Sequence, residues 1–414
     1  MEFKYLAFGI LAFFLFVGLE YIAAIRKRKK HLFKYDSSVA NLSIGIAERL
    51  LNLFISASFI DLFYNVYENY AIFNIPNHWL VWIILLLVTD LVWYWYHRLG
   101  HEINLLWGAH IVHHQSEEFN YTASARITTF QALIRNVFWC VLPLIGFHPA
   151  LIVTILVVHG GYSFFTHTQM IGKLGWFEYI FISPSLHGVH HASNEKYLNK
   201  NYGDLFVFWD KMFGTYMEED EKPTYGLTHQ LNSYSFMWQH FHYFMEIAEA
   251  CRRVDGVWNK LKIIFGRPED LDQDIRPELE KRFLPHKDIK KPTQRFKLYV
   301  SLQIVVSVIL LFALTFFYQG LNLEDKVFGA LFILVTLIYC GALLEQRRWI
   351  YYLEYVRLLI AAGYLSFTFE TYGFIIGSAI MLFVLNVISP LQEWYLNTVY
   401  HSDDERISYL LRKK

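Results

Sequence analysis

The sequence contains few charged residues and few cysteines for its length. Of its 414 residues, 18% are charged and 55% are hydrophobic, whereas a soluble domain usually has about 25% charged residues. This deficit indicates that much of the chain lies out of water. Lysine plus arginine and aspartate plus glutamate each number 37, so composition shows no footprint of a nucleic-acid partner, and we expect none. The three scattered cysteines exclude a disulfide framework and a CxxC zinc site.

Two common enzyme signatures are also missing. The sequence has no GxGxxG loop of a dinucleotide-binding domain, which predicts that no reductase is fused to the chain. It also lacks the HExxH pattern of zinc proteases, because Glu102 directly follows His101 and does not lie between two histidines at that spacing. An oxidoreductase built on this chain therefore needs a diffusible reductant or a separate electron-transfer protein.

Long apolar segments are abundant, and nine of them approach the roughly 18 to 20 residues that cross a bilayer as a helix. The first is interpreted as a membrane anchor, because its basic cluster 26–30 follows the apolar stretch, whereas a cleaved signal peptide carries its positive charge in front. The second is the weakest, since Glu48 and Arg49 lie within it. The expected spans are residues 5–25, 42–64, 79–96, 128–146, 149–167, 297–318, 327–344, 350–368 and 372–395.

Basic residues in the loops orient these spans. If residues 26–30 lie in the cytoplasm, alternation along the chain puts segments 98–128 and 171–295 there too, together with Arg347, Arg348 and the basic tail 412–414. The sequence therefore predicts an all-α, multi-pass membrane protein in a bacterial inner membrane or the endoplasmic reticulum. Residues 1–295 hold all the candidate chemistry and form the predicted catalytic domain, and residues 296–414 form a four-span membrane region.

Eight of the eighteen histidines fall in three short clusters. His97 and His101 form HxxxH, and segments 110–114 and 187–191 both read HxxHH. Residues three and four apart lie on one face of a helix, so each cluster can direct two or three imidazoles at one point. Eight imidazoles exceed the needs of one ion, and two ions with four nitrogens each and an open position fit the count better. The predicted ligands are His97, His101, His110, His113, His114, His187, His190 and His191.

The clusters lie at the ends of spans and in the predicted cytoplasmic loops, which predicts a helical cap around a two-metal site on the cytoplasmic face. His167 ends the fifth span on that side and is predicted as a ninth ligand. His159 lies about two turns deeper, where a polar contact inside the bundle is the alternative to metal ligation, and the role of His229 is open. Imidazole suits iron, zinc, copper and nickel. Next to the membrane, the natural substrate is a lipid and the natural chemistry is oxygen activation.

The clusters resemble those of the fatty acid hydroxylase superfamily, which includes sterol desaturases, sterol methyl oxidases and sphingolipid fatty acid hydroxylases. The sequence is more similar still to alkylglycerol monooxygenases, in segment 101–114 with its glutamate directly after the second histidine. Further similar segments are 118–120, 125–126, 165–168, 201–203, 209–215 and 225–229. The resemblance is dense between about residues 80 and 245. Beyond residue 296 it rests on hydropathy alone.

This resemblance implies two iron ions, dioxygen as oxidant and insertion of one oxygen atom next to a lipid's functional group. In alkylglycerol monooxygenases the lipid is a glyceryl ether and the reductant is tetrahydrobiopterin. The family's histidines correspond to the eight clustered histidines, and its glutamate corresponds to Glu102, which is assigned to proton handling or to a hydrogen bond with a ligand imidazole. Trp209 and Asp210 are expected to support the site. The segment 159–165 departs from the family pattern.

Three other interpretations remain open from the sequence. A fatty acyl or sterol hydroxylase or desaturase with a protein electron donor would use the same iron site. A membrane metal transporter also places histidines beside spans, although transporters bind their ions near the bilayer midplane, and here the clusters lie at span ends. A bis-histidine haem protein needs only two facing histidines per haem and leaves the rest unexplained.

Overall fold

The computed structural model describes residues 3–284, 291–388 and 391–400, so the predicted basic tail lies outside the described residues. Within them the chain forms helices and no strand, apart from two isolated bridges. The fold is therefore all-α, as expected. Two compact units divide the described residues: 13–232 with 238–284, and 3–12 with 233–237 and 291–400. The predicted domains 1–295 and 296–414 are a division by chemistry and stay a prediction.

The larger unit contains most of α1 and α11 and all of α2 to α10, α12 and α13. Their bounds are α1 Phe3–Arg26, α2 Tyr35–Tyr70, α3 Trp79–Glu102, α4 Asn104–His114, α5 Tyr121–Ser124, α6 Thr129–Trp139, α7 Val141–Ile145, α8 Pro149–Thr166, α9 Pro184–His190, α10 Phe208–Phe213, α11 Phe236–Arg252, α12 Val257–Phe265 and α13 Ile275–Phe283. Short 3₁₀ helices are η1 Lys30–Leu32, η2 Gly175–Tyr179, η3 Glu195–Tyr197 and η4 Pro268–Asp270.

Local capping explains where the long helices begin. His78 precedes α3 and its Nδ1 accepts a hydrogen bond from the Leu80 amide at 3.3 Å, and His148 serves α8 in the same way through the Ala150 amide at 3.2 Å. Pro149 follows as the first residue of α8, where its missing N–H costs nothing. Thr128 caps α6 through the Gln131 amide at 3.0 Å.

Six helices are long and apolar enough to cross a membrane: α1, α2, α3, α8, α14 and α15. The pair α17 and α18 would add a seventh, bent by 90°. The expectation of nine spans is therefore not confirmed. The fourth expected span is broken at Cys140 into α6 and α7, and α16, which carries Glu354 and Arg357, is not among the helices that are both long and apolar enough.

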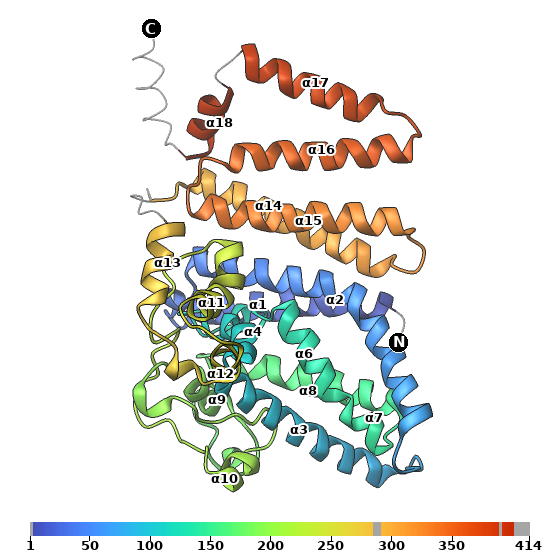
Figure 1. Ribbon diagram of the computed structural model, residues 1–414, viewed down its shortest axis with the longest axis vertical. Coiled ribbons are helices and arrows are strands. Elements are labelled where there is room, and N and C mark those ends of the chain that lie inside the picture. The colour runs from blue at the N-terminus through green and yellow to red at the C-terminus, as the bar shows by residue number, and fades with distance from the viewer. Residues whose placement is uncertain (1–2, 285–290, 389–390, 401–414) are drawn as a thin grey trace. The chain divides into compact units, whose positions relative to one another are not determined.

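The broken pair α6 and α7 nevertheless runs between the same two ends as its neighbours. Thr128, just before α6, donates to the Ala109 carbonyl of α4, whereas at the end of α7 the carbonyls of Leu144 and Ile145 accept from the Ile72 and Phe73 amides after α2. Gly146 follows with φ +121°, and a β-carbon there would lie 2.0 Å from the Phe73 oxygen, so only glycine fits this turn. Figure 1 shows α4, α9, α10 and α12 gathered at the opposite end, where α3 and α8 finish.

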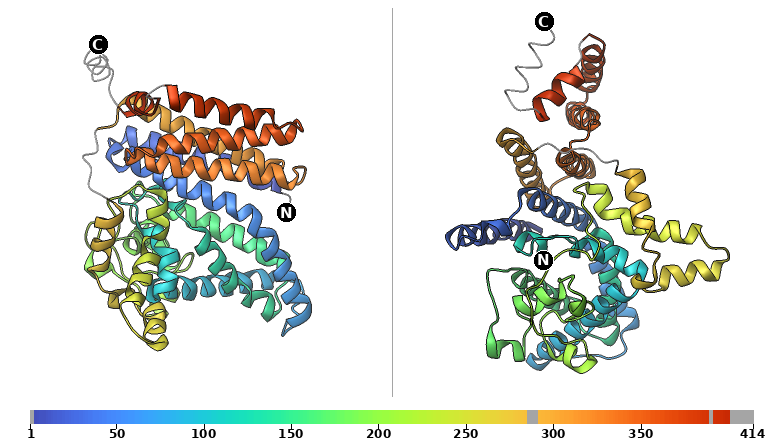
Figure 2. Two further views of the ribbon diagram at one scale, coloured as in Figure 1. Left: turned by 45° about the horizontal axis from the view of Figure 1, so that its top comes forward. Right: turned by 90° about the vertical axis from the view of Figure 1, so that its left-hand side faces the viewer.

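The smaller unit contains α14 Gln294–Phe316, α15 Leu323–Leu344, α16 Ile350–Thr368, α17 Gly373–Ile388 and α18 Leu391–Tyr400. Figure 2 shows α14 to α17 as a series of long antiparallel helices. Polar side chains join them inside: Tyr299 of α14 donates to Glu354 of α16 at 2.7 Å, and Arg357 reaches Glu354 at 2.9 Å and Gln303 at 2.6 Å. Burying both charges next to each other lowers the cost of charge in this apolar unit.

Candidate metal centre

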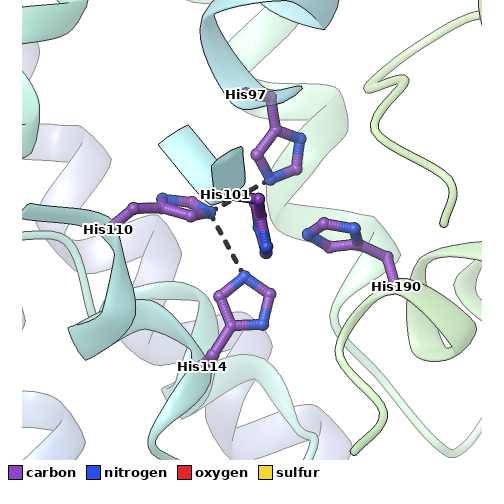
Figure 3. A group of neighbouring side chains, drawn as sticks. All are labelled: His97, His101, His110, His114 and His190. Carbon is purple, nitrogen blue, oxygen red and sulfur yellow. Dashed lines mark hydrogen bonds between the residues drawn. The ribbon is translucent and has the colours of Figure 1, made fainter. Parts of the chain in front are cut away.

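Five histidines converge at the end of α3, and Figure 3 shows their rings directed at a common centre. Their ligand nitrogens all lie within 4.8 Å of one another. The Nε2 atom of His110 is 3.1 Å from Nε2 of His97 and 3.2 Å from Nε2 of His114. We call this set the five-histidine group: His97, His101, His110, His114 and His190.

Four further histidines form a second group with the same spacing. The Nε2 atom of His167 is 3.1 Å from Nε2 of both His113 and His187, and His187 is 3.2 Å from His191. All four rings are buried. We call this set the four-histidine group: His113, His167, His187 and His191.

The donor set fits metal ions in both groups. Two nitrogens that bind one ion at right angles, each about 2.1 Å away, lie about 3.0 Å apart, which is close to the observed 3.1 and 3.2 Å. The buried Nε2 atoms of His101 and His190 have no hydrogen-bond partner within the protein, and such orphaned atoms are rare without a ligand. Five or four nitrogens would each leave room for a further ligand on an ion that takes six.

The two HxxHH segments each serve both groups. In α4, His110 and His114 belong to the five-histidine group and His113 to the four-histidine group. In the segment 187–191, His190 belongs to the five-histidine group, and His187 and His191 belong to the four-histidine group. The i,i+4 pairs therefore stay together, as expected for one helix face. The expected four-and-four division is not what the structure has, because His167, at the end of α8, completes the second group.

Backbone carbonyls orient three of these rings. Nδ1 of His97 donates to the Tyr202 carbonyl, Nδ1 of His190 to the Lys200 carbonyl, and Nδ1 of His167 to the Ser163 carbonyl, each at 2.8 Å. An imidazole with its proton fixed on Nδ1 offers the lone pair of Nε2 inward, which is the usual outer-shell arrangement around a metal. The loop 200–206 thereby helps to shape the five-histidine group.

Burial keeps the imidazoles outside the spans neutral. It lowers the pKa of His167 to about 4 and lowers the pKa values of His113 and His190 well below their ordinary range. The same holds for His110, His114, His187 and His191. Metal binding needs the neutral imidazole, so these rings are ready to act as ligands at neutral pH.

Aromatic side chains cover the groups. The ring of Trp107 lies 4.7 Å from His101 and 5.5 Å from His114. Phe119 packs 5.0 Å from His191 and stacks at 4.8 Å on Tyr225. These walls exclude water from the site, which strengthens electrostatic interactions inside it.

The other predicted residues lie outside both groups. Glu102 is about one-third exposed at the end of α3, and its Oε1 accepts from Arg98 Nε at 2.8 Å. His229 is half exposed and lies 3.6 Å from Glu280. Asp210 acts through the loop, as its carboxylate accepts from the amides of Tyr202 at 2.8 Å and Gly203 at 2.9 Å.

Sequence reasoning missed two buried carboxylates beside the site. Asp90, in the middle of α3, accepts hydrogen bonds from the Leu205 amide at 3.0 Å and from Trp209 Nε1 at 3.0 Å. Asp204 lies in the same loop and is 2% exposed. The available signal was Asp90 itself, since an ionisable residue inside an apolar span is a functional suspect by default.

Comparison with known proteins agrees with this site. The fatty acid hydroxylase family model matches residues 82–215, the range that contains every histidine of both groups. Human alkylglycerol monooxygenase is 31% identical over 345 residues, which is 79% of this chain and 75% of the human protein. The chain belongs to the alkylglycerol monooxygenase family. The zebrafish member (Danio rerio) is 29% identical over 79% of this chain and 74% of its own length.

Similarity to other lipid hydroxylases covers a smaller part of the chain. Human cholesterol 25-hydroxylase is 28% identical over 140 residues, which is 31% of this chain and 48% of that enzyme. No solved structure matches the chain significantly. Membership of the alkylglycerol monooxygenase family, together with the six apolar helices, makes this chain a multi-pass membrane oxidoreductase of the lipid monooxygenase and hydroxylase type.

Proposed function

We propose that this protein is a di-iron monooxygenase that hydroxylates the carbon next to the ether oxygen of an alkylglycerol, with dioxygen as oxidant and tetrahydrobiopterin as electron donor. The observation that carries the proposal is the pair of all-histidine groups at span ends, in a chain that is 31% identical to human alkylglycerol monooxygenase. Buried imidazoles at 3.1 to 3.2 Å spacing would hold the two metal ions.

The proposed reaction balances simply. Alkylglycerol, dioxygen, two protons and two electrons give a hydroxylated ether, which is a hemiacetal, and water. The hemiacetal then breaks into a fatty aldehyde and glycerol without further catalysis. Two iron ions, when bound, supply dioxygen activation for attack on an unactivated C–H bond. We propose that the two electrons come from a separate donor that approaches the protein from the cytoplasm.

The protein's own residues hold and shield this chemistry. The nine histidines of the two groups bind the metals, and the carbonyls of Tyr202, Lys200 and Ser163 fix the tautomers of three of them. Trp107 and Phe119 exclude water from the two groups. Glu102, beside His101 at the span end, is proposed to handle a proton of dioxygen reduction, and its partial exposure gives it access to solvent.

Metal content tests the centre directly. Purified full-length protein should hold about two metal ions per chain, because five and four nitrogens converge at two separate points. Elemental analysis measures this number. Iron is the expected working metal, and zinc is an expected substitute on overexpression. One ion per chain or fewer would contradict the two-metal proposal.

An assay with parallel donors and substrates tests the reaction. Membranes that contain the protein should convert an alkylglycerol to a fatty aldehyde in step with consumption of tetrahydrobiopterin. Ferredoxin or cytochrome with its reductase serves as the parallel donor, and acyl lipids and a sterol as parallel substrates. Turnover of an acyl lipid or sterol with the protein donor, and none of the ether with pterin, would favour the second candidate, an acyl or sterol hydroxylase, to which the similarity with cholesterol 25-hydroxylase points.

A further inference from the structure

A buried charged triad lies outside both histidine groups. His159 of α8 contacts a carboxylate with each ring nitrogen: Nε2 is 2.7 Å from Asp90 Oδ1, and Nδ1 is 2.8 Å from Asp204 Oδ2. All three side chains are at most 2% exposed. A neutral imidazole has a single N–H and would hold its unprotonated nitrogen against a carboxylate oxygen, so two carboxylates at 2.7 and 2.8 Å favour the protonated ring. The triad is thus a buried cation between two buried anions.

The triad joins the two spans that carry metal-group histidines. Asp90 lies seven residues before His97 in α3, and His159 lies eight residues before His167 in α8, so both are about two helical turns below the centre. Asp204 belongs to neither span and lies in the loop 200–206. This loop is therefore held against α3 and α8 by charge.

Asp90 strengthens the same attachment through the backbone. Its carboxylate accepts from the amides of Leu205 at 3.0 Å and Phe206 at 3.1 Å. The loop in turn provides the Lys200 and Tyr202 carbonyls that accept from His190 and His97. Both of these histidines belong to the five-histidine group.

Among the described residues, no ring of the four-histidine group is hydrogen-bonded to this loop, although Asn201 of the loop donates to the Leu186 carbonyl of α9 at 2.9 Å, directly before His187. The oriented ring of this group, His167, donates to the Ser163 carbonyl within α8, and neither Lys200 nor Tyr202 bonds to a member of this group. A disturbance of the loop should therefore act more strongly on the five-histidine group, whose rings it orients directly, than on the four-histidine group.

We propose that His159 is a positioning residue whose buried cation, held between Asp90 and Asp204, fixes the loop 200–206 so that its carbonyls orient His97 and His190. This inference rests on the proposed function in one respect, that the five-histidine group binds a metal ion. Loss of His159 removes the cation between Asp90 and Asp204, whose side chains are 0% and 2% exposed. Because an uncompensated buried charge is strongly unfavourable, we expect the loop that carries Asp204 to move. Misplaced outer-shell partners cost about 10- to 100-fold in metal affinity.

Metal titration of the full-length protein in detergent tests this. Metal-free protein is titrated with Co²⁺ or Zn²⁺ against a competing chelator, and wild type should show two dissociation constants. His159→Asn should raise one constant at least tenfold and raise the other by a clearly smaller factor. The matched control is His148→Asn, the same substitution on the same helix, where asparagine also caps α8 and both constants should stay unchanged.

Charge variants separate positioning from packing. Asp204→Asn keeps His159 paired with Asp90 one to one, so it should fold and should weaken the same constant less than His159→Asn does. The double variant His159→Asn with Asp204→Asn removes one of the two stranded carboxylates and should bind more tightly than His159→Asn alone. A packing role predicts additive losses instead, and additivity would overturn the proposal.

The outcomes for the two proposals are distinguishable. Wild-type protein that binds fewer than two ions contradicts the proposed di-metal function itself. The positioning role is overturned if wild type binds two ions but His159→Asn and Asp204→Asn raise both dissociation constants equally, or raise neither. That result leaves the di-metal site intact. If His159→Asn does not fold, Asp204→Asn alone decides, since it leaves a balanced ion pair.

Discussion

At the residue scale, the histidines of the centre and Glu102 differ in burial and in partners. His113 and His190 are 7% and 5% exposed and belong to different groups. Glu102 is about one-third exposed and is paired with Arg98. Their loss should therefore have different effects. Nothing replaces a buried ring nitrogen within its histidine group, whereas solvent can partly replace an exposed carboxylate.

Substitution of these residues should separate metal binding from turnover. His113→Ala and His190→Ala should each abolish activity and lower the metal content, since each removes a nitrogen from a group. Glu102→Ala should reduce activity by about 10- to 100-fold, the range for outer-shell partners, with metal content near that of wild type. Activity assays and elemental analysis on the same preparations measure both effects.

The control for this series is His229→Ala, which removes a half-exposed histidine outside both groups and should leave both measurements unchanged. If Glu102→Ala lost metal as completely as His113→Ala, Glu102 would itself be a ligand and its proposed role in proton handling would be wrong.

At the element scale, α11 is attached to the end of α4 by a buried polar chain. His242 of α11 accepts from Gln115 Nε2 at 3.0 Å, and its Nδ1 donates to Glu246 at 2.8 Å. Arg276 of α13 donates to the same Glu246 at 2.7 Å. Gln115 directly follows His114, so these hydrogen bonds connect α11 and α13 to the end of α4, the helix that carries His110, His113 and His114. Because His242 uses Nε2 as an acceptor, the geometry requires its neutral form.

The stability of this attachment should therefore depend on pH. Burial lowers the pKa of His242 below its ordinary 6.5, so the folded state binds this proton less readily than the unfolded chain. The resulting contribution to stability is complete above about pH 6.5 and is lost as pH falls towards the depressed folded pKa, by at most about 1.4 kcal/mol per pH unit. Thermal unfolding in detergent between pH 7.5 and 5.5 measures the loss.

The variant His242→Gln has no ring to protonate and should show a smaller decrease in unfolding temperature over this range than wild type. Its stability at pH 7.5 should be lower, because glutamine cannot bond to both Gln115 and Glu246 with the same geometry. An equal pH dependence in the two proteins would mean that other groups cause the decrease.

At the scale of the whole molecule, the loops that follow the histidine helices must lie on one side of the membrane. The segment after α4 and the segment after α10 both adjoin elements that supply or support the centre. The proposed side is the cytoplasm, from the basic residues 26–30. If α6 and α7 together cross the membrane once, as α1, α2, α3 and α8 are long enough to do, the larger unit would cross five times, which is consistent with this arrangement.

Cysteine labelling in intact vesicles tests this topology. In a variant without the three native cysteines, Glu117→Cys and Glu218→Cys place single thiols at exposed positions. A membrane-impermeant reagent should label both only from the cytoplasmic side, because both flank one site. Glu324→Cys, in the predicted external connection before α15, is the control and should be labelled from the opposite side. Labelling of positions 117 and 218 from opposite faces would contradict a single centre.

The number of spans was the least predictable feature of the fold. The break at Cys140 has a local cause that hydropathy does not weigh, since Pro143 has no N–H to donate to the Trp139 carbonyl four residues before it. Similarly, Glu354 and Arg357 are expensive in lipid when each is considered alone, but a 2.9 Å ion pair and the bond from Arg357 to Gln303 reduce that cost inside the unit.

The sequence by itself predicted the membrane character, the family and the nine histidines, because apolar length, i,i+3,i+4 spacing and, for His167, a place at the end of a span are local features of the chain. Only the tertiary structure decided how these rings divide into five and four, since His113 and His114 are adjacent in sequence but face different partners. It also decided the role of His159, whose two carboxylate partners lie 69 and 45 residues away in the chain. Such partners follow from how α3, α8 and the loop 200–206 pack, and no local pattern specifies that packing.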